Sequence, residues 1–148
     1  MPKGWPALNP AGWRDTKYFL LDEKLEKWRY LKGSKRIERK KPNGETYCFA
    51  EGNLSFPDKL DVPARTMLTS ESTTNRSSHV VEDKFSGNLR TLTPVETERI
   101  QMFPDNWTNI ESKAMTERRR YFMMGNALVV GIVKRLGKAI SEIVDNEL

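Results

Sequence analysis

The stretch from Lys24 to Lys41 contains the densest group of chemically active side chains in the sequence. Nine of its residues are basic and only Glu26 and Glu38 are acidic, so its net charge is nine minus two, or +7. Lys and Arg at this density attract nucleic-acid phosphates, because binding releases the counterions condensed on them. Trp28 and Tyr30 add rings that can stack on bases or sugars. The stretch predicts a nucleic-acid contact; the alternative is an ordinary solvated face, since Lys and Arg usually lie at protein surfaces.

The net charge is divided unevenly along the chain. Residues 1–92 hold 17 basic and 12 acidic side chains, whereas residues 93–148 hold 8 of each, so the whole formal charge of +5 belongs to the first part. A polyanionic partner is therefore expected to lie against residues 1–92. With 148 residues, of which 37% are hydrophobic, the chain suits one modest domain or part of a larger protein.

Cysteine and histidine are scarce. Cys48 and His79 are the only residues of their types, which excludes a disulfide framework and a multi-cysteine zinc site and leaves few options for a His-based metal site. We expect no metal, a structural role for His79 and a buried or edge-strand position for Cys48. No apolar run approaches the ~20 residues that cross a bilayer, and no signal-peptide apolar region follows Met1. These features favour a soluble cytoplasmic protein (bacterial cytoplasm or nucleoid) without a membrane partner.

Local patterns in the first part predict a helix and a hairpin. Apolar residues three apart predict a helix over Asp22–Leu31, which Gly33 ends. Residues 36–41 and 45–49 flank Asn43-Gly44, a pair that tolerates the positive φ angles of a tight hairpin turn.

The following region is rich in loop-forming residues. Residues 50–63 contain Gly52, Pro57 and Pro63 and are expected to be loop. The apolar pairs Met67-Leu68 and Val80-Val81 predict short strands joined by polar loops.

The last third of the sequence has helical patterns. Thr93-Pro94-Val95-Glu96 predicts a capping box with proline at the first helical position, opening a helix that runs to about Met102. A second helical pattern begins near Thr116 and is interrupted by Gly125-Asn126, and a last helix is expected over residues 128–145. The apolar positions of that helix recur at helical spacing and form one face, which needs another layer to cover it: Val129, Ile132, Val133, Leu136, Ile140 and Ile143.

Two of these stretches together resemble conserved motifs of DNA (cytosine-5)-methyltransferases. Residues 90–107 resemble the ninth motif, in which Arg-x-Leu-Thr-Pro leads through a Glu and an Arg-Leu-Gln-like step to Phe-Pro-Asp. Residues 120–130 resemble the tenth motif, built around Gly-Asn-Ala/Ser-Val. Residues 64–69, leading to Arg76 and His79, resemble the end of the target-recognition region that precedes the ninth motif. The similarity is good over residues 64–140, whereas residues 1–63 fall where family members vary most.

The resemblance implies an α+β fold with two parts. Residues 1–112 would form a small β-rich target-recognition domain that includes the ninth motif. Residues 113–148 would form the helical tenth-motif segment, whose last helix completes the α/β methyltransferase domain of a partner or missing half. An apolar helix face that this chain cannot cover agrees with that arrangement.

The resemblance also implies roles for individual residues. Asn126 and Ala127 would line the S-adenosylmethionine pocket, although a plain helix break with Asn as cap is the alternative. Thr66 would meet the DNA backbone. Three loop residues are candidates for phosphate or base-edge contact, and each is also compatible with an ordinary polar loop: Arg65, Asn75 and Arg76. Three residues are expected to brace the recognition loops without touching substrate: Arg90, Thr93 and Glu96. The run Arg118-Arg119-Arg120 reaches phosphate or forms a solvated helix face.

The catalytic motifs of the family are missing from this sequence. Methylation of cytosine C5 requires a thiolate that attacks C6 of a flipped base. The family nucleophile follows a proline, whereas Cys48 follows Tyr47 and precedes the recognition region. No Gly-x-Gly cofactor loop and no Glu-Asn-Val step occur in the chain. The chain alone is therefore expected to be inactive.

These observations predict the DNA-recognition part of a DNA (cytosine-5)-methyltransferase. Its partners would be double-stranded DNA and a catalytic half that carries the cysteine, with S-adenosylmethionine shared between the two, and a homodimer through the last helix is a further possibility. A natural subunit of a split enzyme, which Met1 favours, and an expressed fragment are both compatible with the sequence. The alternatives are a non-catalytic DNA-binding or regulatory module and, less compatible with two ordered motifs, a basic RNA-binding domain.

Overall fold

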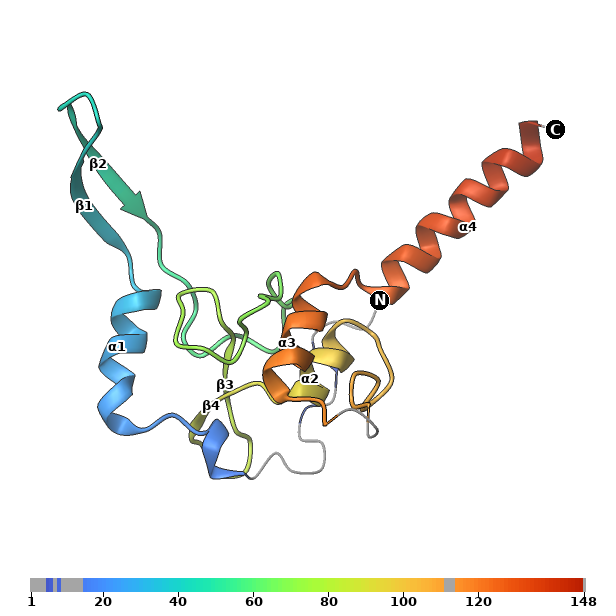
Figure 1. Ribbon diagram of the computed structural model, residues 1–148, viewed down its shortest axis with the longest axis horizontal. Coiled ribbons are helices and arrows are strands. Elements are labelled where there is room, and N and C mark those ends of the chain that lie inside the picture. Colours follow the sequence, from blue (N-terminus) through green and yellow to red (C-terminus); the bar gives the residue numbers. More distant parts are fainter. Residues whose placement is uncertain (1–4, 7, 9–14, 111–113, 148) are drawn as a thin grey trace.

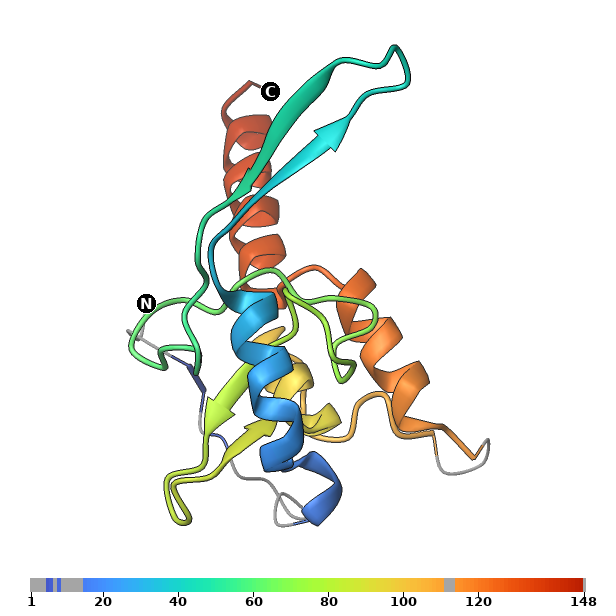
Figure 2. The same cartoon turned by 90° about the vertical axis from the view of Figure 1, so that its left-hand side faces the viewer.

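The computed structural model describes residues 5–6, 8, 15–110 and 114–147, which form a body with two projecting arms (Figure 1). One arm is a hairpin of two strands and the other is the last helix. In both views the arms rise on the same side of the body (Figure 2). The elements follow one another in this order: η1 (Thr16–Tyr18), α1 (Asp22–Lys32), β1 (Lys35–Lys40), β2 (Thr46–Glu51), β3 (Val80–Glu82), β4 (Leu89–Thr91), α2 (Pro94–Ile100), α3 (Glu117–Asn126) and α4 (Val130–Glu147).

The predicted α+β class and the predicted hairpin are both confirmed. Strands β1 and β2 pair antiparallel, from Lys35 opposite Glu51 to Lys40 opposite Thr46. The turn needs a positive φ at one residue only, Gly44 with φ 87°, while Asn43 accepts a hydrogen bond from the Glu45 amide (3.2 Å). The hairpin is the whole of its sheet, and a second small sheet pairs β3 with β4.

The core lies between the second sheet and helices α2 and α3. Met67, Val81, Leu92 and Met124 form its buried cluster. The predicted strand at Met67-Leu68 is wrong, because these residues lie in a turn-rich loop where the Leu68 amide donates to the Glu71 carboxylate (3.0 Å). Met67 is apolar because it fills the core, and an apolar pair by itself does not distinguish a core-facing loop from a strand.

Helix α2 starts as the sequence predicts and ends slightly earlier. The Thr93 hydroxyl accepts from the Glu96 amide (3.3 Å) and the Glu96 carboxylate accepts from the Thr93 amide (2.8 Å), so the predicted capping box is confirmed. The helix ends at Ile100 instead of Met102. Met102 adopts φ 63°, a left-handed conformation that stops the helix.

The last two helices differ from the prediction at their junction. Helix α3 begins after Thr116, as expected, with the Thr116 hydroxyl accepting from the Arg119 amide. The expected interruption at Gly125-Asn126 is wrong: both residues belong to the last turn of α3, and the break comes at residues 127–129. None of the described helices is long and apolar enough to cross a membrane.

Helix α4 is the second arm, and it extends away from the body (Figure 1). No residue of the helix is buried. Leu136 and Ile140, in the middle of the apolar face, are 59% and 60% exposed. The uncovered apolar face expected from the sequence is therefore present.

Candidate functional site

The loop of residues 64–79 is held between α3 and the base of the hairpin. On the α3 side, Gly125 lies against the loop backbone: a Cβ built on Gly125 would lie 2.3 Å from the Thr69 nitrogen and 2.4 Å from the Leu68 carbonyl carbon. No real Cβ tolerates such distances, so glycine is required for this contact. The small residue of the tenth-motif segment therefore serves close packing against the loop.

Arg76 fastens the other end of the loop to the hairpin. Its Nη1 atom donates to the carbonyls of Leu31 (2.7 Å) and Gly33 (3.1 Å), just before β1, and its Nη2 atom donates to the carbonyl of Gly52, just after β2. The Glu51 carboxylate lies 3.6 Å away. One guanidinium thus joins both ends of the hairpin to the loop.

Arg65 is also engaged within the chain. Its Nε and Nη2 atoms donate to both carboxylate oxygens of Asp58 (2.9 and 3.1 Å), and its Nη1 atom donates to the Ser77 carbonyl (2.8 Å). Asp58 is buried and also accepts from the Val80 amide (2.8 Å). The prediction that Arg65 and Arg76 contact DNA stays a prediction, but in this structure both arginines shape the loop.

Lys32 and Trp28 correct the expectation for the basic stretch. Lys32 is buried and donates to the Ser78 carbonyl (2.6 Å), and its ammonium lies 3.5 Å from the Asp58 carboxylate. Burial lowers the pKa of Lys32, and the neighbouring Asp58 offsets part of that effect. Trp28 is only 1% exposed, so its ring belongs to the core and is not available to stack on bases, whereas Tyr30 is exposed.

Thr66 and Asn75 are the predicted loop contacts whose side chains face solvent. Both residues are exposed. The side-chain oxygen Oδ1 of Asn75 accepts from the Ser77 amide (2.9 Å), and the side-chain NH2 group has no hydrogen bond to the described residues. They are two of the exposed polar residues of this loop.

The interior of the loop is organised around Glu71 and His79, which are both buried. The Glu71 carboxylate accepts from the Leu68 amide and the His79 amide, and the Nδ1 atom of His79 lies 2.8 Å from Glu71 Oε1. The rings of Trp5 and His79 lie nearly perpendicular to each other, with centroids 5.4 Å apart. These contacts give His79 the structural position expected from the sequence.

The three predicted bracing residues form one buried unit below the loop. The Arg90 guanidinium donates to both carboxylate oxygens of Glu96, at 2.8 and 2.7 Å. The same carboxylate closes the capping box with Thr93. The Tyr121 hydroxyl of α3 donates to the Leu92 carbonyl (2.7 Å), and burial raises the pKa of that hydroxyl. This unit joins β4, α2 and α3.

Arg120 belongs to a second buried unit. Its Nη2 atom donates to Glu98 (2.9 Å) and its Nε atom donates to the Thr108 hydroxyl (3.1 Å). The other oxygen of Glu98 accepts from the Asn106 amide (2.7 Å). Of the run Arg118-Arg119-Arg120, the first two residues form the exposed face and the third braces the loop after α2.

The tenth-motif residues lie beside an open groove. Ala127 lines this groove of about 510 Å³, which passes between the loop and the first turns of α4. Asn126 is exposed and donates from Nδ2 to the Phe122 carbonyl (2.8 Å). The groove also contains Arg65 and Thr66, but most of its lining residues are apolar: Pro63, Ala64, Met67, Ile100, Leu128, Val129, Ile132, Val133 and Leu136.

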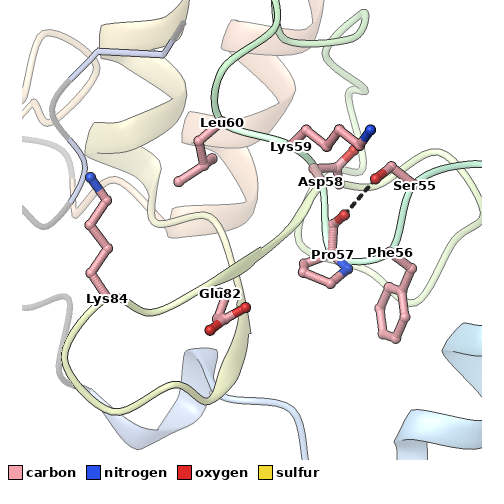
Figure 3. Close-up of a pocket in the computed structure, with 8 residues that line it drawn as sticks. All are labelled: Ser55, Phe56, Pro57, Asp58, Lys59, Leu60, Glu82 and Lys84. Atoms are coloured by element: carbon pink, nitrogen blue, oxygen red, sulfur yellow. Dashed lines mark hydrogen bonds between the residues drawn. The ribbon is translucent and has the colours of Figure 1, made fainter.

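A second pocket lies beside Asp58 (Figure 3). It has a volume of about 470 Å³ and is lined by residues 55–60 together with Glu82 and Lys84. The Ser55 hydroxyl donates to the Pro57 carbonyl across its wall (2.8 Å). The Asp58 carboxylate is saturated by the contacts described above, and none of the predicted site residues lines this pocket.

Groups for nucleophilic or metal chemistry are sparse in the described residues. Cys48 is exposed on β2, which pairs only with β1, so it is the edge-strand thiol of the two expected positions. Within the described ranges, no three His, Cys, Asp or Glu side chains are grouped as metal ligands. What these residues offer is a braced polar loop, a basic hairpin and an unpartnered helix.

Residues 5–142 match the protein family described as C-5 cytosine-specific DNA methylase. The chain belongs to this family. It is also 47% identical over 129 residues to the type II methyltransferase M.Sau3AI of Staphylococcus aureus. That alignment covers 87% of this chain and 30% of the relative, so the chain spans less than a third of the relative's length. Comparison with solved structures found no match.

The bracing contacts also include two acidic residues, Asp58 and Glu98, that the sequence alone did not single out. Asp58 orders the loop through Arg65, Lys32 and the Val80 amide, yet it lies in a proline-containing segment without a recognisable motif. The sequence places Glu98 in a predicted helix but does not indicate its role. Both act on partners distant in sequence, so no local pattern marks them.

Proposed function

We propose that this chain is the DNA-recognition part of a DNA (cytosine-5)-methyltransferase. One combined observation carries the proposal. Residues of the ninth-motif and tenth-motif segments brace the loop of residues 64–79, whereas the Pro-Cys and glycine-rich motifs do not occur in this sequence. The chain would bind duplex DNA and hold a site in place while a catalytic half transfers the methyl group from S-adenosylmethionine to cytosine C5.

The loop of residues 64–79 would face the DNA. Of the loop residues predicted to contact DNA, Thr66 and Asn75 are the exposed ones, so they are the proposed direct contacts. We also propose that Arg65 and Arg76 contact DNA directly. Each guanidinium would then share or exchange the partners that it now has within the chain. Their contacts within the chain support positioning of the loop more directly.

Helix α4 would dock on the catalytic half. Its apolar face is exposed along its length, and a face of this size usually marks an interface. Asn126, the last residue of α3, and Ala127, in the break before α4, would border the cofactor. The groove beside Ala127 is mostly apolar, so this chain would supply only one wall and the catalytic half would hold the polar parts of S-adenosylmethionine.

The contacts of α3 favour a different division of the chain from the one at residues 112 and 113. Tyr121 and Gly125 bind α3 to the body, through Leu92 and the backbone at Thr69. Of these last two helices, only α4 extends away from the body (Figure 1). We therefore place the boundary of the recognition part at residues 127–129.

Co-expression tests the proposed function against a regulatory or simple DNA-binding role. A truncated M.Sau3AI that lacks the matched segment would be expressed with and without this chain, and plasmid resistance to a methylation-sensitive restriction enzyme would be scored. Plasmid resistance that requires both proteins supports the proposal that this chain is the DNA-recognition part. Duplex binding without resistance supports a non-catalytic module, and a preference for RNA in a filter-binding salt series would support the basic RNA-binding alternative.

The oligomeric state separates two partners for α4. If the helix serves a catalytic half, the chain alone stays monomeric in sedimentation at micromolar concentrations or dimerises only weakly. A tight dimer that the charged variant Leu136→Glu dissociates would instead assign the face to a second copy of the chain.

A further inference from the structure

The β1–β2 hairpin has two faces with different chemistry. Side chains alternate between faces along a strand, and directly paired residues share a face. One face therefore carries the pairs Lys35–Glu51, Ile37–Phe49 and Arg39–Tyr47, and the other carries Arg36–Ala50, Glu38–Cys48 and Lys40–Thr46. We refer to the second set of six residues as the Arg36 face.

The basic side chains of the first face have partners within the chain. Lys35 donates to the Leu31 carbonyl (3.1 Å) and lies 3.6 Å from the Glu51 carboxylate. The Arg39 guanidinium stacks over the Phe49 ring at 3.8 Å. These contacts leave the basic side chains of the first face less available to bind an external phosphate.

The basic side chains of the Arg36 face have no such partners among the described residues. Among the described residues, the side chains of Arg36 and Lys40 have no ion pair, hydrogen bond or ring contact, and both residues are exposed. They lie four positions apart along the strand, which separates their backbones by about 13 Å, so we expect them to bind different phosphates. Thr46, opposite Lys40, adds a hydroxyl donor. An isolated hairpin is marginal in water, so a partner surface would also stabilise it.

We propose that the Arg36 face lies along the sugar–phosphate backbone of the DNA, where Arg36 and Lys40 neutralise two separate phosphates. This rests on the proposed function, because it assumes that duplex DNA occupies the adjoining loop. Arg76 supports the geometry: it joins the loop to both ends of the hairpin, so DNA held at the loop meets the hairpin in a fixed orientation. The contact gives affinity without reading sequence.

Cys48 provides a direct probe, because it is the only cysteine of the chain and lies on the Arg36 face. The rate of alkylation by N-ethylmaleimide would be measured on the full chain with and without a saturating random-sequence duplex. We expect DNA to slow the reaction by roughly fivefold or more, through steric cover and the negative potential that disfavours the thiolate. Unchanged alkylation in a complex that anisotropy shows to be saturated would overturn the proposal.

A matched variant reports on the opposite face. Cys48→Ser combined with Tyr47→Cys moves the single thiol to the neighbouring position, whose side chain points the other way. The proposal predicts much weaker protection by DNA there. Equal protection at both positions would show that DNA does not distinguish the faces and would contradict the assignment.

Salt dependence gives an independent measurement. Arg36→Gln with Lys40→Gln should reduce the magnitude of the slope of log K against log salt by about 2, since each phosphate contact contributes about 0.9. Lys134→Gln with Arg135→Gln removes the same charge from the polar side of α4 and should leave the slope unchanged. Glu38→Gln, which removes the one acidic group of the Arg36 face, should tighten binding. Wild-type slope in the hairpin variant overturns the inference alone, whereas no duplex binding by the wild-type chain overturns the proposed function as well.

Discussion

Gly125 of α3 lies so close to Thr69 that a Cβ on the glycine would sit 2.3 Å from the Thr69 backbone nitrogen. The contact is between backbones, so a rotamer change cannot relieve it. Through it, the segment that resembles the tenth motif sets the position of the proposed DNA-facing loop.

The first prediction concerns this contact. Gly125→Ala normally favours a helix by up to about 1 kcal/mol, but here overpacking should outweigh that gain and cost about 1–3 kcal/mol of unfolding free energy. Gly137→Ala is the control, because nothing lies within 4 Å of its Cβ position in α4. Urea unfolding and duplex binding would be measured for both variants. A Gly125→Ala protein with wild-type stability and binding would contradict the close approach.

The second prediction compares two Arg–carboxylate pairs of equal sequence spacing. Arg90 and Glu96 are both buried, so Arg90→Met leaves a buried carboxylate without its main partner and should cost about 3–5 kcal/mol. Arg99 and Asp105 form a similar pair at the surface (2.6 Å), and Arg99→Met should cost no more than about 1 kcal/mol. Equal losses in urea unfolding would contradict the bracing role of Arg90. If Arg90→Met does not fold, Thr93→Ala tests the same unit with a loss of about 1 kcal/mol.

The third prediction concerns Arg76. If it fastens the hairpin, Arg76→Ala should accelerate amide hydrogen exchange in β1 and β2 by freeing the carbonyls at both ends of the hairpin, with little change in α3. A residue that only contacts DNA would leave exchange in the free protein unchanged. Exchange rates measured by mass spectrometry without DNA therefore separate the two roles.

The fourth prediction concerns acid stability. Burial alone would raise the pKa of Asp83, but hydrogen bonds from the Ser86 amide and hydroxyl (both 2.8 Å) and from the Phe85 amide outweigh it and hold the pKa below the ordinary 3.8. Above that value the carboxylate is ionised in both folded and unfolded chains, and its stabilisation is complete. As the pH falls below 3.8 the unfolded chain takes up the proton first, and the stabilisation is lost.

Asp83→Asn should therefore flatten the dependence of unfolding free energy on pH below about 4, besides lowering stability at neutral pH. The measurement is urea unfolding across an acid pH series. A variant with the same acid-side slope as the wild-type chain would show that the Asp83 pKa is not depressed.

The fifth prediction concerns the apolar face of α4. Leu136→Glu and Ile140→Glu should leave the unfolding of the body unchanged, because these side chains are exposed in the isolated chain. They should abolish complementation of the truncated relative, because a charge would be buried at the interface. Lys134→Glu on the polar side is the control and should still complement. Loss of complementation in all three variants alike would argue against docking through the apolar face.

Much of the fold followed from local sequence signals. The hairpin around Asn43-Gly44 and the capping box of Thr93 and Glu96 depend on residues within a few positions of one another, so a pattern identifies them. The apolar face of α4 was equally visible. The end of α3 could not be predicted in this way. Gly125 resembles a helix break in the sequence, but a glycine is needed there because the Thr69 backbone, far away in sequence, lies against it.

The candidate site was harder to read. Arg65 and Arg76 have the residue type and loop position of DNA contacts, but their partners are Asp58 and backbone carbonyls that only the folded chain brings near. Trp28 lies in a basic stretch and is nevertheless core. A residue type indicates what a side chain can bind, whereas its neighbours in the fold decide what it does bind.

Transfer of a radiolabelled methyl group from S-adenosylmethionine to duplex DNA tests the central claim most directly. Three purified samples would be compared: this chain, M.Sau3AI without its matched segment, and the two together. The account predicts no incorporation by either protein alone and incorporation by the mixture. Incorporation by this chain alone would contradict it, since the chain would then perform the chemistry that we assign to a partner.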